Sequence, residues 1–121
     1  MKLEMDLIRK MVLAVEDAPT GFVQRNPTIE GYTPEQIGYH AYQLIDGGLA
    51  EGPKVGDTRS TGPDAIISNL TWRGHEFAAA ARNETTWKKV MIIVRDKGGS
   101  VTLPIVIELL KLYMRSNFGL G

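Results

Sequence analysis

The strongest constraint on the fold is a helix whose start and end are both written into the sequence. Residues 33–36 place a threonine hydroxyl at the N-cap, proline at the first helical position and glutamine at the third, which is a capping box. The glycine pair at 47–48 ends the helix with a residue free to adopt a positive φ. Its apolar residues fall on one stripe: Ile37, Ala41, Leu44 and Ile45. The sequence therefore predicts an amphipathic helix with one buried face.

A polar segment follows this helix and separates two short apolar runs. Leu49–Glu51 has the pattern of a strand that begins directly after the helix, and Ala65–Leu70 returns as another. The stretch Val55–Asp64 between them is too polar to bury, so the pattern predicts a β-hairpin. Thr71 is placed to cap the next helix, Trp72 to about Arg82. The inward residues of that helix are Phe77, Ala78 and Ala81.

Helical spacing of apolar residues predicts three further helices. They cover Leu3 to about Ala18, about 84–97, and about 103–116, the last capped by Thr102. Their buried stripes are, in order, Ile8, Met11, Val12 and Val15; Trp87, Val90, Met91 and Val94; and Val106, Leu109, Leu110 and Tyr113. Phe22–Ile29 is rich in β-formers at its ends and contains Pro27, which cannot donate to a ladder. We therefore expect a brief edge strand there.

Composition narrows the class of protein. The chain has 121 residues, 43% hydrophobic and 23% charged, which is typical of one globular domain. A net charge of zero excludes attachment to nucleic acid by bulk charge, and the absence of cysteine excludes disulfides and thiolate chemistry. No apolar run is long enough to span a membrane, and the acidic start lacks the core of a signal peptide. We expect a cytoplasmic protein with no membrane partner.

The order of these elements is the one expected of a winged helix. Tyr39–Gly52 resembles the end of a winged-helix recognition helix, which closes on Gly-Leu and passes into the first strand of the wing. Asn69–Phe77 is similar to the Leu-Thr-x-x-Gly signature that leaves the wing in many bacterial regulators. We therefore expect an α+β fold: a single winged helix-turn-helix-like domain over residues 1–121. It would carry a small antiparallel β-hairpin as its wing and two additional C-terminal helices.

Short motifs along nearly the whole chain resemble one narrower group. They are Met5–Lys10, Gly31-Tyr32, Tyr39-His40, Leu70–Phe77, Trp87–Val90 and Lys97–Val101. In this order they resemble the phage and prophage proteins of domain of unknown function family 2513. The resemblance implies a small winged-helix-like protein of mobile-element origin. It implies no reaction, because the family has no assigned one.

The sequence carries no motif for catalysis. His40 and His75 have no partner histidine at metal-ligand spacing, and there is no Gly-x-Ser-x-Gly elbow and no phosphate-binding glycine loop. A Ser-His-Asp arrangement stays open, but histidines in such settings are more often partly buried and hydrogen-bonded, or simply exposed. We expect no enzyme activity, no metal site and no cofactor.

DNA binding is the leading functional hypothesis, because the expected fold suggests it. The residues that would face bases are Gln36, Tyr39, His40 and Gln43, and those that would hold phosphates are Lys54, Arg59 and Arg73. However, Thr33–Gly52 contains no Lys or Arg and three acids, which the DNA backbone repels. Six basic residues between 70 and 97 would compensate only if several share a face with the wing. Otherwise they are the solvated sides of two helices.

The alternative is a protein–protein interaction module that engages a host or phage protein through the acidic helix face, without DNA binding. The last two helices also suggest an interface. Their additional apolar residues are Ile92, Ile93, Ile105, Ile107, Leu112 and Met114. Since a chain of this size has too little interior to surround two helices, we expect a homodimer through the C-terminal helices. The other explanation is that these helices pack between the winged core and the first helix.

Overall fold

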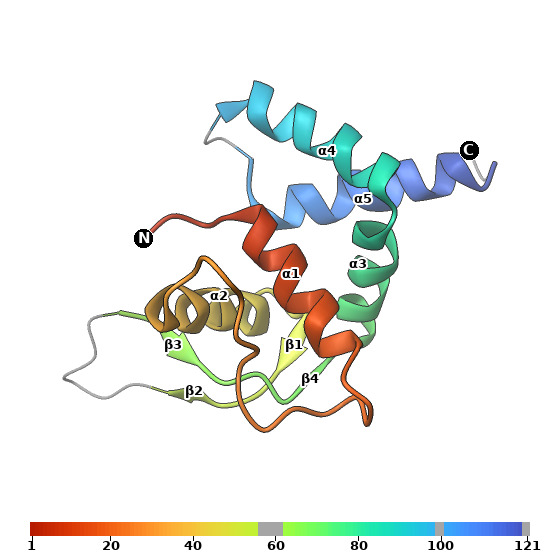
Figure 1. Ribbon diagram of the computed structural model, residues 1–121. Coiled ribbons are helices and arrows are strands. Elements are labelled where there is room, and N and C mark those ends of the chain that lie inside the picture. Colours follow the sequence, from red (N-terminus) through yellow and green to blue (C-terminus); the bar gives the residue numbers. More distant parts are fainter. Residues whose placement is uncertain (56–61, 99–100, 120–121) are drawn as a thin grey trace. The chain divides into compact units, whose positions relative to one another are not determined.

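Two helices, four short strands and then three helices follow one another in the computed structural model, which describes residues 1–55, 62–98 and 101–119. The elements are α1 (Met5–Glu16), α2 (Pro34–Asp46), β1 (Ala50–Glu51), β2 (Lys54–Val55), β3 (Asp64–Ala65), β4 (Asn69–Leu70), α3 (Trp72–Arg82), α4 (Glu84–Asp96) and α5 (Leu103–Asn117) (Figure 1). They form two compact units, residues 1–75 and 76–121, and the boundary falls within α3. The α+β class is confirmed, while the single domain stays a prediction.

The predicted hairpin exists as two short antiparallel ladders. Strand β1 pairs with β4, with Ala50 opposite Leu70, and β2 pairs with β3, with Lys54 opposite Ala65. Gly52 separates the ladders with a φ of +155°, and a Cβ there would collide with the carbonyl of Ile66. The two ladders therefore bend around a position that only glycine fits.

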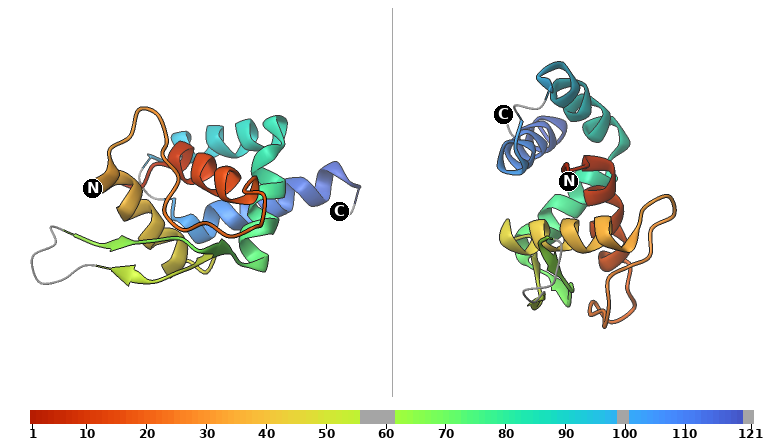
Figure 2. Two further views of the ribbon diagram at one scale, coloured as in Figure 1. Left: turned by 60° about the horizontal axis from the view of Figure 1, so that its bottom comes forward. Right: turned by 90° about the vertical axis from the view of Figure 1, so that its left-hand side faces the viewer.

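The predicted edge strand at Phe22–Ile29 is wrong. The backbone there makes one ladder-like bond, from Val23 N–H to the carbonyl of Ser68 at 2.8 Å. Farther on, the side-chain amide of Asn26 takes the place of a peptide group: it donates to Ala65 O at 2.7 Å and accepts from Ile67 N–H at 2.8 Å. The segment is thus held beside the hairpin by a side chain, and no strand forms. Figure 2 shows residues 17–33 running along the hairpin.

The core of the first unit comes from both predicted helical stripes. All four predicted residues of α1 are buried together with Leu7, and α2 adds Ile37, Ala41 and Leu44, while Ile45 is half-buried. Residues 17–33 contain turns and extended backbone but no helix. Helices α1 and α2 are therefore not joined by the turn of about three or four residues that defines a helix-turn-helix. The winged helix-turn-helix identity stays a prediction.

A compact junction connects α2, the hairpin and α3. The Thr71 hydroxyl donates to Gly48 O at 2.6 Å and accepts from Gly74 N–H at 3.1 Å, which caps α3 as predicted. The Thr71 amide donates to Leu49 O at 3.0 Å. A Cβ on Gly74 would collide with that same Leu49 carbonyl. The Leu-Thr-x-x-Gly motif therefore holds the start of α3 against the turn that ends α2.

The second unit consists of the rest of α3 with α4 and α5, and α4 and α5 lie side by side (Figure 2). Asn83 caps α4 by accepting from Thr86 N–H at 3.0 Å, and Phe77 meets Trp87 edge to face at 6.2 Å. The predicted stripes are partly confirmed. Trp87, Val90, Met91, Val106 and Leu110 are buried, whereas Val94, Leu109 and Tyr113 are half-buried. Thr102 precedes α5 but makes no side-chain capping bond.

The close approach at Gly74 generates a prediction about stability. Gly74→Ala forces the new methyl group against the Leu49 carbonyl, so we expect the free energy of unfolding to fall by about 1–3 kcal/mol. Gly62→Ala is the matched control, because nothing lies within 4 Å of its added Cβ. Urea denaturation followed by circular dichroism measures both variants. Equal stabilities would contradict the tight junction.

Candidate binding surface

The outward face of α2 begins at its capping box, which is confirmed. Gln36 N–H donates to the Thr33 hydroxyl at 3.2 Å, and Thr33 N–H donates to the Gln36 side-chain oxygen at 2.8 Å. The Gln36 amide therefore already holds the start of its own helix. To contact a base edge it would have to give up part of the cap.

His40 lies inside the first unit, so its expected place on the outward face is wrong. Its side chain is fully buried. Nε2 accepts the Glu4 backbone N–H at 2.8 Å, so Nδ1 carries the ring proton and donates to Gln36 O at 2.7 Å. Burial lowers the pKa of His40 below its usual value and keeps the ring neutral. This histidine joins the entry to α1 to the first turn of α2.

Tyr39 and Gln43 remain on the surface side of α2. Both are half-buried, and the Tyr39 ring meets His40 edge-on with ring centroids 5.3 Å apart. Since residues four apart lie on the same side of a helix, Tyr39 and Gln43 share one strip of the surface. Of the four residues that were expected to face bases, these two therefore remain available to a partner.

Lys54, the expected phosphate contact at the base of the hairpin, is directed at α2. Its Nζ lies 3.0 Å from an Asp46 carboxylate oxygen and 4.6 Å from the centre of the Tyr42 ring. The hydrogen bond to Asp46 raises the pKa of Lys54, against a smaller opposing effect of burial. The pair is exposed, and such pairs contribute little to stability and break easily.

The two expected arginines differ in what the structure says of them. Arg59 lies outside the described residues. Arg73 is exposed in the first turn of α3, and its guanidinium approaches the Gly48 turn, 3.9 Å from the position a Cβ would take there. Arg73 therefore adds a cation at the C-terminal end of α2, where the helix dipole is negative.

Carboxylates nevertheless dominate the α2 side of the unit. Glu35, Asp46 and Glu51 are exposed, and the Asp64 carboxylate comes so close to Gly38 that a Cβ there would collide with it. The charges along the sequence follow the same division. Residues 1–75 contain seven Lys and Arg but ten Asp and Glu, whereas residues 76–121 contain seven and four. The first unit is therefore acidic and the second basic, although the whole chain is neutral.

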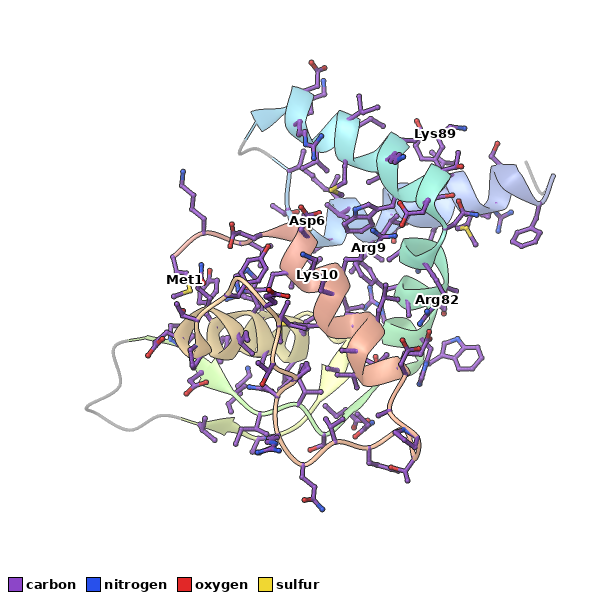
Figure 3. All side chains as sticks on the ribbon, in the orientation of Figure 1. Met1, Asp6, Arg9, Lys10, Arg82 and Lys89 are labelled. Atoms are coloured by element: carbon purple, nitrogen blue, oxygen red, sulfur yellow. The ribbon has the colours of Figure 1, made fainter. Side chains whose placement is uncertain are left out.

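Three of the sequence motifs meet where α1 starts. Asp6, Arg9 and Lys10 project from α1 (Figure 3), and Lys10 Nζ lies 5.6 Å from the centre of the Tyr32 ring. Burial, reinforced by the charges of Glu4 and Asp6, raises the pKa of Tyr32. Together with the Glu4–His40 bond, these contacts give the motifs around residues 5–10, 31–32 and 39–40 a structural role in attaching α1 to α2.

Trp72 is a candidate that the sequence reasoning missed. It opens α3 as a residue that is 79% exposed, an unusual position for the largest apolar residue. Large exposed aromatic side chains often anchor protein interfaces. The helical period contains the signal, because Trp72 lies five residues, about 140° around the helix, from the buried Phe77.

Neither a metal cluster nor a membrane-spanning helix is found among the residues that the structure describes. Within residues 1–55, 62–98 and 101–119, no three His, Asp or Glu side chains gather as a metal ion would require, and no helix combines the length and apolarity of a membrane span. His75 is half-exposed, with Nδ1 3.4 Å from a Glu16 carboxylate oxygen. It is therefore part of a surface contact between α1 and α3.

An α+β protein with an acidic helix-and-hairpin surface is the class that this geometry defines. The chain belongs to the family described as "Hypothetical protein (DUF2513)", whose model matches residues 2–100. It is similar to an uncharacterised protein of Haemophilus influenzae (strain ATCC 51907 / DSM 11121 / KW20 / Rd). The two are 30% identical over 115 residues, which cover 88% of this chain and 89% of that relative. No solved structure matches this chain.

The buried histidine generates a prediction about pH. Because the pKa of His40 is lower in the folded state, the unfolded chain takes up a proton first as the pH falls below about 6.5. The free energy of unfolding should therefore decrease from about pH 7.5 to about pH 5.5. His40→Gln should be less stable at the higher pH by about 1–3 kcal/mol, since two buried hydrogen bonds are disturbed, and its stability should depend less on pH.

Urea denaturation at both pH values measures this difference. His75→Gln is the matched control, because it makes the same change at a half-exposed histidine and leaves the buried imidazole of His40 in place. If His40→Gln kept the full pH dependence, the buried imidazole would not be its source.

Proposed function

We propose that this protein is a protein-interaction module of winged-helix type, and that the α2 face binds a basic surface of a partner protein. The observation that supports this most is the charge around α2. Exposed carboxylates and half-buried tyrosines lie along its outward side, and Lys54 is already bonded to Asp46. The phage or prophage origin implied by the motif resemblance is part of the proposal, and no catalytic residue is assigned.

Two features make this face suited to a protein. Tyr39 and Tyr42 are half-buried, so their rings are held in place and would lose little conformational freedom on binding. Glu35 and Asp46, at opposite ends of the helix, would attract a basic partner and set its orientation. Interaction modules with uncharged or acidic recognition helices occur among winged-helix domains, which supports the proposal only by analogy.

DNA binding is the second candidate, and one observation favours it. Helix α2, the hairpin and α3 follow one another along the chain and meet at the Thr71–Gly74 junction, and this chain order is the one expected of a winged helix. The Lys54–Asp46 pair is exposed and could open to release a cation for a phosphate. This candidate ranks second because the surrounding carboxylates oppose the approach of a phosphate backbone.

Fluorescence anisotropy with random-sequence duplex DNA separates the two candidates. The assay is run at about 50 mM and 200 mM salt. We expect that replacing Lys54 and Arg73 together with alanine does not weaken any binding to DNA that is observed. The control replaces Lys88 and Lys89, two exposed lysines of α4, so it makes the same change of charge in the other unit. The opposite outcome would favour DNA over a protein partner. In that case the affinity for DNA would fall tenfold or more between the two salt concentrations, and the variant with Lys54 and Arg73 replaced would lose this salt dependence while the Lys88 and Lys89 control kept it.

Site-specific photo-crosslinking in a bacterial host tests the protein partner directly. A photoreactive residue at Gln43 should give a discrete crosslink to another protein, and the same residue at Lys88 should not. Tyr39→Ala should reduce this crosslink about tenfold or more, as expected for an interface anchor, whereas Tyr39→Phe should keep it. Glu35→Lys should also weaken it if the partner is basic. A crosslink unaffected by these changes would place the interface elsewhere.

A further inference from the structure

An apolar groove along α5 is left unexplained by the proposed function. It is lined by Pro104, Ile105, Glu108, Leu109 and Leu112 and has a volume of about 430 Å³. Ile105 is 46% exposed and Leu112 is 55% exposed. Large apolar side chains gathered at one exposed place are uncommon on proteins that act alone, and they usually mark an interface.

The spacing of the groove residues matches the seam of a coiled coil. Ile105, Leu109 and Leu112, followed by Ser116, are separated by four, three and four residues. The opposite side of the helix is already in use, since Val106 and Leu110 are buried. On that side Thr86 of α4 donates to Met114 Sδ at 3.7 Å. Helix α5 therefore binds α4 along one side and presents a second seam on the other.

The edge of this second seam carries one acidic and one basic residue, which can pair with the same two residues of a second copy. Glu108 and Arg115 are both exposed and lie seven residues apart, so they flank the same edge of the groove. Glu108 already lies 4.0 Å from Lys111 Nζ on its own helix, but exposed contacts of this kind contribute little and exchange readily. When two such helices meet antiparallel about a twofold axis, Leu109 of one copy lies opposite Leu112 of the other. Glu108 then lies opposite Arg115, twice by symmetry. A parallel pairing would place Glu108 near Tyr113 and give it no opposite charge.

We infer that two copies of this chain associate through antiparallel α5 helices, with the three apolar residues in the seam and two reciprocal Glu108–Arg115 ion pairs at its edge. A second copy fits better than a foreign helix, because the pattern complements itself under a twofold rotation. Each copy also contributes α4, so the product is a four-helix arrangement. Helix α5 is only about 22 Å long, and we therefore expect a weak dimer, with a micromolar dissociation constant.

Sedimentation velocity from about 1 to 200 µM tests the apolar seam. The unchanged chain should shift from monomer to dimer across this range. Leu112→Glu should raise the dissociation constant at least tenfold, because it buries a charge in the seam. The matched control is Ile92→Glu, which changes a residue of α4 that is 64% exposed, and it should leave the dimer intact. A monomer at every concentration, or equal effects of the two variants, would overturn the inference.

Charge reversal tests the orientation. Glu108→Arg and Arg115→Glu each place two like-charged pairs at the seam, so each variant alone should dissociate about tenfold more readily. Mixing the two variants should restore the dimer as a heterodimer, in which both ion pairs are of opposite charge. The double variant should form a homodimer again. A mixture that stays monomeric would overturn the antiparallel pairing, and circular dichroism of each variant verifies that it is folded.

Discussion

The first unit depends on one contact, the close approach of α3 to the turn that ends α2. The Thr71 hydroxyl bonds to Gly48 O and to the amide of Gly74, and the missing Cβ of Gly74 leaves room for the Leu49 carbonyl. Strand β1 begins and strand β4 ends at this junction, so its geometry sets the direction in which the hairpin leaves α2. A side chain at position 74 would collide with the Leu49 carbonyl and push α3 away from the start of the hairpin.

The surface of α2 shows how structural demands reduce the residues available for recognition. Gln36 holds the cap, His40 joins α1 to α2 from inside the unit, and Lys54 is bonded to Asp46. Each of these contacts uses a polar group that a DNA-binding helix would need to keep for bases or phosphates. The groups that remain along α2 are mainly exposed carboxylates and half-buried tyrosines, and this is why we propose a basic protein surface as the partner.

The two units differ in charge and in the exposed surface that each offers to a partner, which suggests a division of roles between them. The acidic first unit presents the α2 face and Trp72, and the basic second unit presents the groove on α5. Because the proposed partner-binding face and the proposed self-association seam belong to different units, each can be altered without touching the other. A dimer would present two copies of the α2 face and would raise the avidity for a repeated partner.

Local signals in the sequence determined the helices, the capping box and the hairpin, because caps, glycine stops and a period of 3.6 depend on neighbouring residues. Tertiary structure alone decided where polar side chains would go. Outward and inward positions are adjacent on a helix, so the helical period alone does not decide which side a polar residue takes. His40 lies inside because its ring accepts the Glu4 backbone N–H, 36 residues away in the sequence. In the same way the hydrogen bonds of Asn26 replaced the predicted edge strand, because a side-chain amide can satisfy Ala65 and Ile67 as a peptide group would.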